Sequence, residues 1–274
     1  MNVKQILWVM SLALTTISLT SCNFSNDELR HMARKEAGKD DFRDSEKWGK
    51  VMTQTLELDA FTRIDLQGSA DIKFTQGDTF KIEVQGNEKA IASNDISVVD
   101  VVDGILVIKH AQNAPKRVPT VKFFITAPNL ERIDVSGSGD IDLKGKSEFP
   151  NDLSIHISGA GDVDVEHVKC KKLDISISGT GDITAKKIKC KKAHIAISGA
   201  GDMKADVKAN DIAVEISGSG DADLDVMCQN LTVSAGGTGE IELKGECTHF
   251  IKQASGMANI DSRQLAIHEG IVIQ

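Results

Sequence analysis

Residues 153–182 read LSIHISGAGDVDVEHVKCKKLDISISGTGD, and residues 183–202 read ITAKKIKCKKAHIAISGAGD. Both segments alternate apolar with polar residues, and both end in the phrase Gly-x-Gly-Asp. Alternation with a period of two is typical of β-strands that bury one face. Because similar segments recur about every 20 residues, the sequence indicates a repeat architecture rather than an ordinary globular fold.

The phrase Gly-x-Gly-Asp occurs five times, and a sixth copy carries glutamate in place of aspartate. The first glycines of successive copies are 22, 20, 20, 19 and 19 residues apart. We interpret the phrase as a structural turn: glycine permits positive φ and close approach of stacked backbones, and aspartate binds nearby backbone amides. The motif residues are Gly137, Gly139, Asp140, Gly159, Gly161, Asp162, Gly179, Gly181, Asp182, Gly199, Gly201, Asp202, Gly218, Gly220, Asp221, Gly237, Gly239 and Glu240.

The segments between these turns predict an all-β fold, a parallel β-helix with rungs of about 19–22 residues. Each rung holds three short apolar-polar segments, such as 153–157, 163–165 and 168–170. The crossovers of a βαβ sheet need a dozen or more residues, and no segment of helical period separates these strands. Stacked rungs lie about 4.8 Å apart, with alternate side chains pointing into a shared core.

The N-terminal residues predict export and a lipid anchor. Residues 1–21 have Lys4 followed by an apolar stretch, as in a signal peptide. The sequence Leu-Thr-Ser-Cys at 19–22 resembles a lipobox, so Cys22 is the expected lipid attachment site on a membrane of the cell envelope. A plain signal peptide or a membrane-spanning anchor is the alternative.

The rest of the chain divides into a tether and one domain. Residues 22–50 are rich in charge and lack apolar periodicity, which predicts a flexible tether that includes Trp48. Residues 51–274 are expected to form the β-helix domain. Within it, 51–130 form irregular first rungs and 131–274 form the regular ones. Gly68–Asp71 is a degenerate early copy of the motif.

Composition and motifs exclude several functions. The formal net charge is −8, and removing residues 1–21 with Lys4 makes it −9. Without a basic arm, nucleic acid is not an expected partner. The sequence carries no nucleophile elbow, zincin motif or phosphate-binding loop, so we predict no enzyme, no cofactor and no metal. A glycan-cleaving enzyme is a lesser alternative, because such enzymes also use parallel β-helices.

Three sets of polar residues could have a role beyond the scaffold. The motif carboxylates would form a column one rung apart, which a calcium ion could neutralise, although we expect a structural role. The cysteines pair by position, Cys170 with Cys190 and Cys228 with Cys247, and we favour buried thiols over disulfides. Lysines form an exposed basic corner that is either solvated or a dock for anionic glycans or lipid head groups: Lys169, Lys171, Lys172, Lys186, Lys187, Lys189, Lys191 and Lys192.

The tandem Ser-Gly-x-Gly-Asp turns, the opening Phe61–Ile64 and the lead-in Pro128–Asp134 resemble the head GIN domain of putative auto-transporter adhesins. The resemblance covers roughly residues 56–270. It implies an exported, often lipid-anchored, right-handed parallel β-helix, and it supplies no catalytic or binding residues. Departures from the family pattern are Ala70, Glu240 and the segment Met257–Asn259.

These observations leave two main hypotheses of function. The first is a lipid-anchored envelope or surface protein, an adhesin whose repetitive exterior binds a glycan or another protein. The second is a structural envelope module that forms homo-oligomers, for example through the apolar segment Gly270–Ile273.

Overall fold

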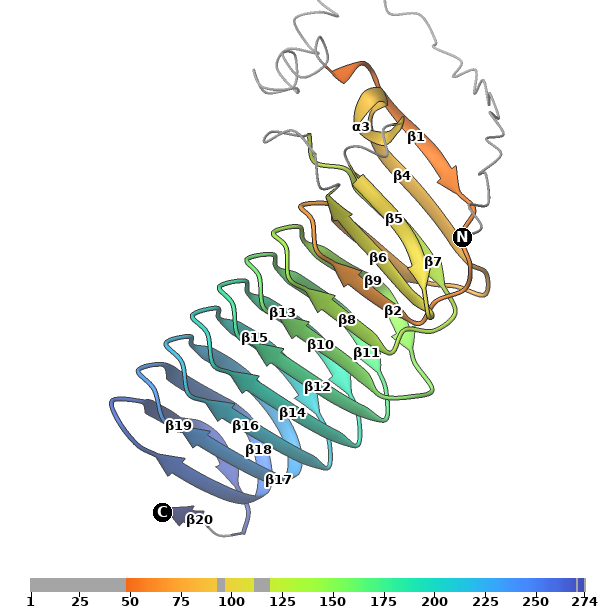
Figure 1. The fold of residues 1–274 in the computed structure, drawn as a ribbon. Helices are drawn as coiled ribbons and strands as arrows, with labels where there is room; N and C mark the ends of the chain where they lie inside the picture. The colour runs from red at the N-terminus through yellow and green to blue at the C-terminus, as the bar shows by residue number, and fades with distance from the viewer. Residues whose placement is uncertain (1–47, 93–96, 111–118, 270, 274) are drawn as a thin grey trace, which may run out of the picture. The chain divides into compact units, whose positions relative to one another are not determined.

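The computed structural model describes residues 48–92, 97–110, 119–269 and 271–273. The predicted signal peptide, Cys22 and residues 23–47 of the predicted tether lie outside these residues. The described part is an all-β solenoid in which consecutive turns stack along one axis (Figure 1). The predicted fold is therefore confirmed, with parallel pairing of the described strands from β8 (Arg132–Val135) to β20 (Ile271–Ile273).

Each regular rung contributes one strand to each of two parallel stacks. The first stack contains β8 (Arg132–Val135), β10 (Leu153–Ile157), β12 (Lys172–Ile177), β14 (Lys192–Ile197), β16 (Asp211–Ile216), the second halves of β17 and β18, and β20 (Ile271–Ile273). The second stack contains β9 (Ile141–Glu148), β11 (Val163–Lys169), β13 (Ile183–Lys189), β15 (Met203–Lys208), the first halves of β17 (Ala222–Ala235) and β18 (Glu240–Ala254), and β19 (Asn259–Ile267).

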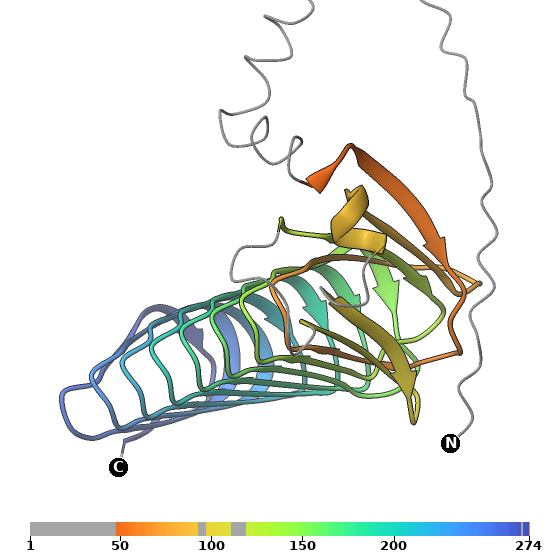
Figure 2. The same ribbon diagram turned by 45° about the horizontal axis from the view of Figure 1, so that its top comes forward.

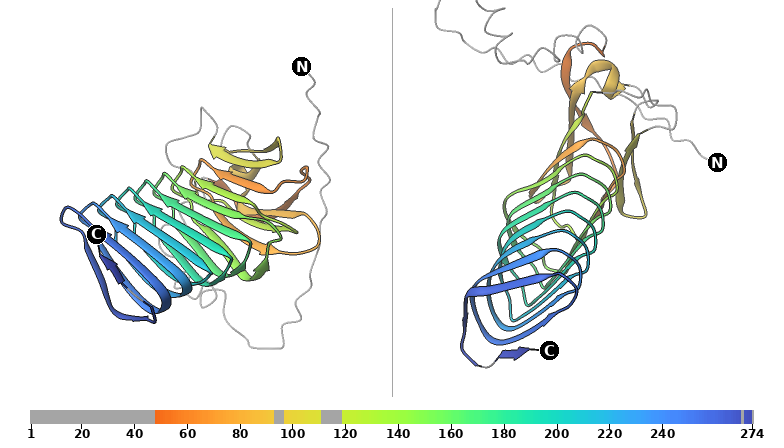
Figure 3. Two further views of the ribbon diagram at one scale, coloured as in Figure 1. Left: turned by 90° about the horizontal axis from the view of Figure 1, so that it is seen from below. Right: turned by 90° about the vertical axis from the view of Figure 1, so that its left-hand side faces the viewer.

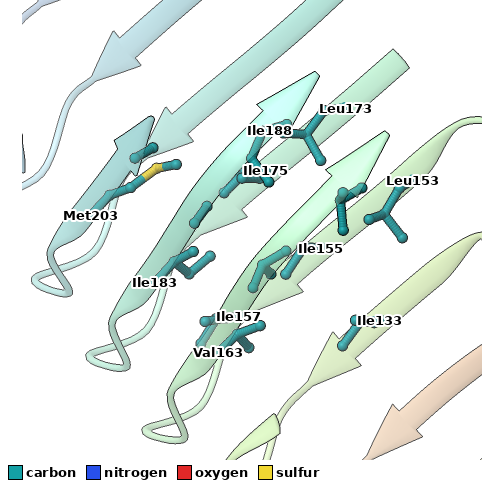
Figure 4. Packing of buried hydrophobic residues seen from close by; sticks show 14 of the residues in the cluster. Ile133, Leu153, Ile155, Ile157, Val163, Leu173, Ile175, Ile183, Ile188 and Met203 are labelled. Atoms are coloured by element: carbon teal, nitrogen blue, oxygen red, sulfur yellow. The ribbon is translucent and has the colours of Figure 1, made fainter. Parts of the chain in front are cut away.

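The register places like residues above one another. Ile155 of β10 pairs with Ile175 of β12, which pairs with Ile195 of β14. All three side chains are buried, whereas the residues between them face outward, as the alternation predicts. Figure 4 shows such aliphatic side chains meeting between the two stacks. The inner face of every regular rung thus joins one continuous aliphatic core.

The rungs have two strands rather than the three short ones that the sequence pattern suggested. In β13 the expected second and third segments form one strand, which is interrupted by a register shift between Ala185 and Ile188. Lys187 at this bulge has a φ of 54°. Since β15 reaches the same register with one residue fewer, the bulge accounts for the shortening of the repeat from 20 to 19 residues.

The N-terminal end departs from sequential stacking. Strand β2 (Arg63–Leu66) lies between β6 (Ile105–His110) and β8, and β3 (Asp71–Gln76) lies between β7 (Lys122–Ala127) and β9. The rung formed earliest in the sequence is therefore the second in space. The chain moves outward after β3 and returns past it to begin the regular rungs (Figure 2).

Antiparallel strands cover this end of the stacks. Strand β4 (Lys81–Asn87) pairs antiparallel with both β7 and β1 (Val51–Leu56), and β5 (Ser97–Val102) pairs antiparallel with β6. The short helix α3 (Glu88–Ala92) follows β4. The colours of Figure 3 place these N-terminal strands at the end of the solenoid opposite to β19 and β20. The region predicted as irregular first rungs thus holds one displaced rung, β2 with β3, which lies between the rung of β6 with β7 and the regular rungs, together with the strands that cap this end.

The last residues of the predicted tether take part in the folded unit. Trp48 is only 7% exposed. The backbone oxygen of Gly49 accepts a hydrogen bond from the Asn87 side chain, and that of Lys50 accepts one from Glu88 N–H. The packed structure therefore begins a few residues before the alternating pattern does.

Candidate functional site

The repeated turns bring motif glycines of successive rungs into direct backbone contact. A Cβ on Gly179 would lie 2.0 Å from the carbonyl oxygen of Gly159, and one on Gly181 would lie 2.1 Å from that of Gly161. Comparable distances recur at every motif glycine from Gly137 to Gly239. Since the obstacle is backbone that stacked strands hold in place, any side chain there would force the rungs apart.

The sequence suggested two reasons for the motif glycines, positive φ and close approach of stacked backbones, and only the second one holds. Among the described residues, positive φ occurs at glycines 49, 104, 145, 245 and 256, none of which belongs to the motif. The expectation that motif glycines adopt positive φ was wrong. Close approach between rungs is what excludes side chains from these positions. The early copy follows the same geometry, because Gly137 lies against the carbonyl oxygen of Gly68.

The motif carboxylates form a hydrogen-bonded ladder along the axis. Asp162 N–H donates to Asp140 Oδ1 at 3.0 Å, and Asp182 N–H donates to Asp162 Oδ1 at 2.8 Å. The pattern continues through Asp202 and Asp221 to Glu240, whose Oε1 accepts from the Asn259 side chain. Each aspartate therefore binds an amide of the next rung, and the ladder ties neighbouring turns together.

The hydrogen bonds of this ladder take up carboxylate oxygens that the alternative of a calcium-binding column would need. One oxygen of each motif aspartate is already engaged by a backbone amide, and the side chains are exposed. Within the described ranges, no group of three or more His, Cys, Asp or Glu side chains is arranged to hold a metal ion. The geometry thus gives the carboxylates a structural partner without an ion.

The four cysteines of the domain lie where the sequence placed them, at the corner that leads from the second stack into the first. Cys170 and Cys247 are buried, Cys190 and Cys228 are partly buried, and all four are free thiols. Cys228 and Cys247 are register partners. The neighbouring thiol of Cys190, together with burial, raises the pKa of Cys170. Burial likewise raises the pKa of Cys228 to about 12.

Exposed lysines alternate with the inward cysteines at the same corner. Lys169 pairs in register with Lys189, which pairs with Lys208. Lys172 pairs with Lys192, and Lys191 N–H donates to the Lys171 backbone oxygen at 2.8 Å. We call the following residues the lysine corner: Lys169, Lys171, Lys172, Lys189, Lys191, Lys192 and Lys208. Lys186 and Lys187, which the sequence grouped with them, lie at the bulge that precedes the corner.

Most cations of the lysine corner lack an anionic partner. Lys169 contacts Glu148 at 2.9 Å, and Lys192 contacts Asp211 at 3.6 Å. For the other five lysines, the described residues provide no ion pair within 4 Å. Hydrogen bonds from Lys146 and Lys169 lower the pKa of Glu148 to about 2. The lysine corner is therefore a cationic segment, and acidic residues lie at its two ends along the solenoid axis.

Two open hollows flank the corner on the outer face of the first stack. One, of about 350 Å³, is lined by Lys172, Lys192, His194 and Asp211, with Ala213 and Thr232 beside them. The other, of about 670 Å³, is lined by Arg63, Glu131, Arg132, Asp134, Asp152 and Lys171. Sequence reasoning missed the second hollow, because its N-terminal wall, Arg63 and Ile105, comes from rungs that stack out of sequence order beside the regular rungs that supply the other lining residues.

The second hollow contains a tightly held charge pair. The Arg132 guanidinium donates two hydrogen bonds to the Asp134 carboxylate, at 2.6 and 2.8 Å. Hydrogen bonding to Asp134 raises the pKa of Arg132. Arg63 is the register partner of Arg132 and is exposed. The second hollow is therefore of mixed charge, with Arg63, Arg132 and Lys171 facing Glu131, Asp134 and Asp152.

Comparison with known proteins assigns the chain to a family described as a putative adhesin and finds solved structures with the same fold. A family model described as "Putative auto-transporter adhesin, head GIN domain" matches residues 60–207 and, in a second match, 202–272. The comparison with curated proteins yields no match. No helix among the described residues is both long and apolar enough to cross a membrane.

Three solved structures share the fold at low sequence identity. A "putative adhesin" from Bacteroides fragilis has 21% identity and a TM-score of 0.61, over 82% of this chain and 96% of its own. A "putative adhesin" from Parabacteroides distasonis has 18% identity and a TM-score of 0.63, over 82% and 94%. A "putative lipid binding protein" from the same species has 20% identity and a TM-score of 0.60, over 82% and 97%.

Proposed function

The chain belongs to the head GIN domain family of putative auto-transporter adhesins, and from this premise we propose that it is a non-catalytic binding module, held on the cell envelope by a lipid on Cys22. Its ligand is a glycan or a protein of a neighbouring surface. The family description names an adhesin, which supports an envelope or surface location and a binding role.

One observation carries the proposal. At the buried register position of the first stack every rung carries a β-branched aliphatic residue: Ile155, Ile175, Ile195, Val214 and Val233. The adjacent outward position changes with every rung: Ser154, Asp174, His194, Ala213 and Thr232. The scaffold is thus uniform inside and varied outside, so the outer face can present a distinct pattern of polar groups to a partner.

A binding assay tests this function directly. We expect the purified full-length chain, in detergent micelles, to bind a subset of an array of glycans and isolated envelope proteins. A reducing-sugar assay on every bound glycan should show no release above the blank. Absence of any bound component would refute the binding role, and sugar release would move the protein to the class of glycan-cleaving enzymes.

The anchor has its own test. Cells grown with labelled palmitate should incorporate label into the wild-type chain and not into the Cys22→Ser variant. Protease added to intact cells should then degrade residues 51–274 if the domain faces outward. Label that persists in the variant would contradict attachment at Cys22, whereas a domain protected from protease would favour a role inside the envelope.

The oligomeric alternative depends on the C-terminal segment. Strand β20 pairs in parallel with Phe250–Lys252 of β18, so one edge of this apolar segment is already satisfied. Light scattering on the eluted full-length chain distinguishes the two hypotheses. A monomeric mass, after correction for detergent, supports the binding module, whereas a defined oligomer supports the structural module.

A further inference from the structure

We propose that the lysine corner is a binding site for a linear anionic polysaccharide, such as a polymer of uronic acids. The proposal rests on the binding function proposed above and assigns it a place and a ligand class. The site consists of the lysine corner and the hollow beside it that Lys172, Lys192 and His194 line.

The fold itself does not require lysine at this corner. In the next rung, Asn210 and Asp211 replace the pair formed by Lys191 and Lys192, with the same register. One rung further, Gln229 and Asn230 occupy these places, and their backbone amides donate to the Asn210 oxygen as Asn210 and Asp211 donate to that of Lys191. The same turn thus forms with asparagine, glutamine or aspartate side chains in these places. Backbone geometry therefore does not explain why lysine occupies them in the earlier rungs.

The lysines also act against the stability of the fold. Register pairing holds the backbones of Lys169, Lys189 and Lys208 one rung apart, about 4.8 Å per step. Like charges at such spacing repel one another. The chain is acidic overall, with a formal net charge of −8, yet within the described ranges Lys169 and Lys192 are the only lysines of the corner that a carboxylate approaches within 4 Å. An external anion would supply the missing counter-charge.

The shape of the surface favours a chain over a plane as the anionic partner. Glu148 and Asp152 occupy the corner in the rung before the lysines, and Asp211 and Glu246 occupy it in later rungs. A flat membrane laid along the corner would meet these carboxylates together with the lysines. A polymer that crosses the corner at Lys171, Lys172, Lys191 and Lys192 meets mostly cations, and one of its sugars can enter the adjoining hollow of about 350 Å³, where Asp211 is the one carboxylate of the lining.

The choice of lysine sets the mode of binding. Lysine presents a mobile point charge, whereas arginine presents a rigid fork suited to one bidentate partner. The corner therefore selects charge density along a polymer rather than one anion in a fixed pose, and salt should weaken its binding.

The test compares charged and neutral forms of one polymer. The full-length chain in detergent micelles is titrated with polygalacturonate and with fully methyl-esterified polygalacturonate at about 0.01 M salt and at about 1 M salt. We expect binding of the charged polymer at low salt, its loss at high salt, and no binding of the esterified polymer. Equal binding of both polymers would overturn the proposal.

A rung transplant provides the matched variant. Lys171→Gln, Lys172→Asn, Lys191→Gln and Lys192→Asn together copy the residues at 229 and 230 into two lysine rungs. We expect affinity for polygalacturonate to fall by about tenfold or more. The control variant changes Lys73, Lys109, Lys122 and Lys204 to glutamine, which alters net charge equally, and its affinity should stay within about twofold.

Two further outcomes separate this inference from the proposed function. If the rung transplant keeps wild-type affinity for polygalacturonate, the assignment of the corner is wrong. It is also wrong if the Cys22→Ser chain, without detergent, binds vesicles of phosphatidylglycerol more tightly than both the polymer and vesicles of phosphatidylcholine. If the array nevertheless detects ligands for the wild type, the general binding role remains. If neither polymer nor array component binds, both proposals fall.

Discussion

The backbone of Gly237 lies against the carbonyl oxygen of Gly218 so closely that a Cβ on Gly237 would be 1.9 Å from that oxygen. The residue before it behaves differently. A Cβ on Gly236 would meet Ser255 Oγ at 3.4 Å, an ordinary contact, and serine occupies the equivalent places 178, 198 and 217. Of these two adjacent glycines, Gly237 therefore has no room for a side chain, whereas Gly236 has room for one.

Replacing these two glycines gives the first prediction. Gly237→Ala should lower the free energy of unfolding by about 3 kcal/mol or more, because backbone must move to admit the methyl group. Gly236→Ala should be neutral or stabilising by up to about 1 kcal/mol, because alanine restricts the unfolded chain. Urea unfolding followed by circular dichroism measures both. Equal losses in the two variants would contradict the role of close backbone approach.

The second prediction concerns the carboxylate ladder. Asp182 Oδ1 accepts from Asp202 N–H at 2.7 Å. Asp182→Ala should therefore cost about 1 kcal/mol of stability. Asp182→Asn retains an acceptor oxygen and should change stability by less than about 0.5 kcal/mol. The same unfolding measurement tests both variants, and an Asn variant as unstable as the Ala variant would show that charge, not the hydrogen bond, matters.

A third prediction follows from the elevated pKa of Cys228, which burial raises to about 12. The thiol stays protonated in the folded protein at pH values where the unfolded chain already releases its proton. The raised pKa therefore contributes stability that is complete below the unfolded pKa, near 9, and is lost as pH rises toward 12. Cys228→Ala should remove part of the loss of melting temperature in this alkaline range.

Alkylation provides a second readout for the same thiol. Iodoacetamide should label Cys228 slowly in the folded protein near neutral pH and rapidly in denaturant, because only the thiolate reacts. Mass spectrometry of the peptide that contains Cys228 gives both rates. Fast labelling of the folded protein would show that the thiol is neither protonated nor protected.

The fourth prediction tests the repulsion within the lysine corner without any ligand. The rung transplant at Lys171, Lys172, Lys191 and Lys192 should raise the free energy of unfolding by about 1 kcal/mol at low salt. The gain should shrink at about 1 M salt, where charges are screened within about 3 Å. Denaturant unfolding at the two salt concentrations measures it, and a gain that persists in high salt would point to packing instead.

Sequence alone predicted the regular rungs because two independent signals agree there. The glycine pairs fix the period, and the alternation around Ile155 or Ile175 fixes which face is buried. The positions of the inward cysteines and outward lysines followed directly from that register. The repeat was thus enough to predict most of the fold and most of the exposed lysines at the corner.

The displaced rung could not be predicted, because pairing partners are not a local property. Strands β2 and β6 show the same alternation, and nothing within either states that they adjoin one another while β8 lies on the other side of β2. The larger hollow was missed for the same reason. The hydrogen bond that Asp162 accepts comes from Asp182 in the next rung and not from its own turn. It could not be predicted either, because the donor lies 20 residues away in the sequence.

The position of β2 between β6 and β8 has a consequence for how the protein is made. A chain that emerges N-terminus first cannot complete the hydrogen bonds of β2 until β8 has also emerged. Its N-terminal strands therefore stay incompletely paired until then. Once β8 and β9 have docked, each later rung finds a finished template and needs only local chain to extend it. Assembly should therefore have one slow beginning at the capped end, followed by rapid zippering toward the C-terminus.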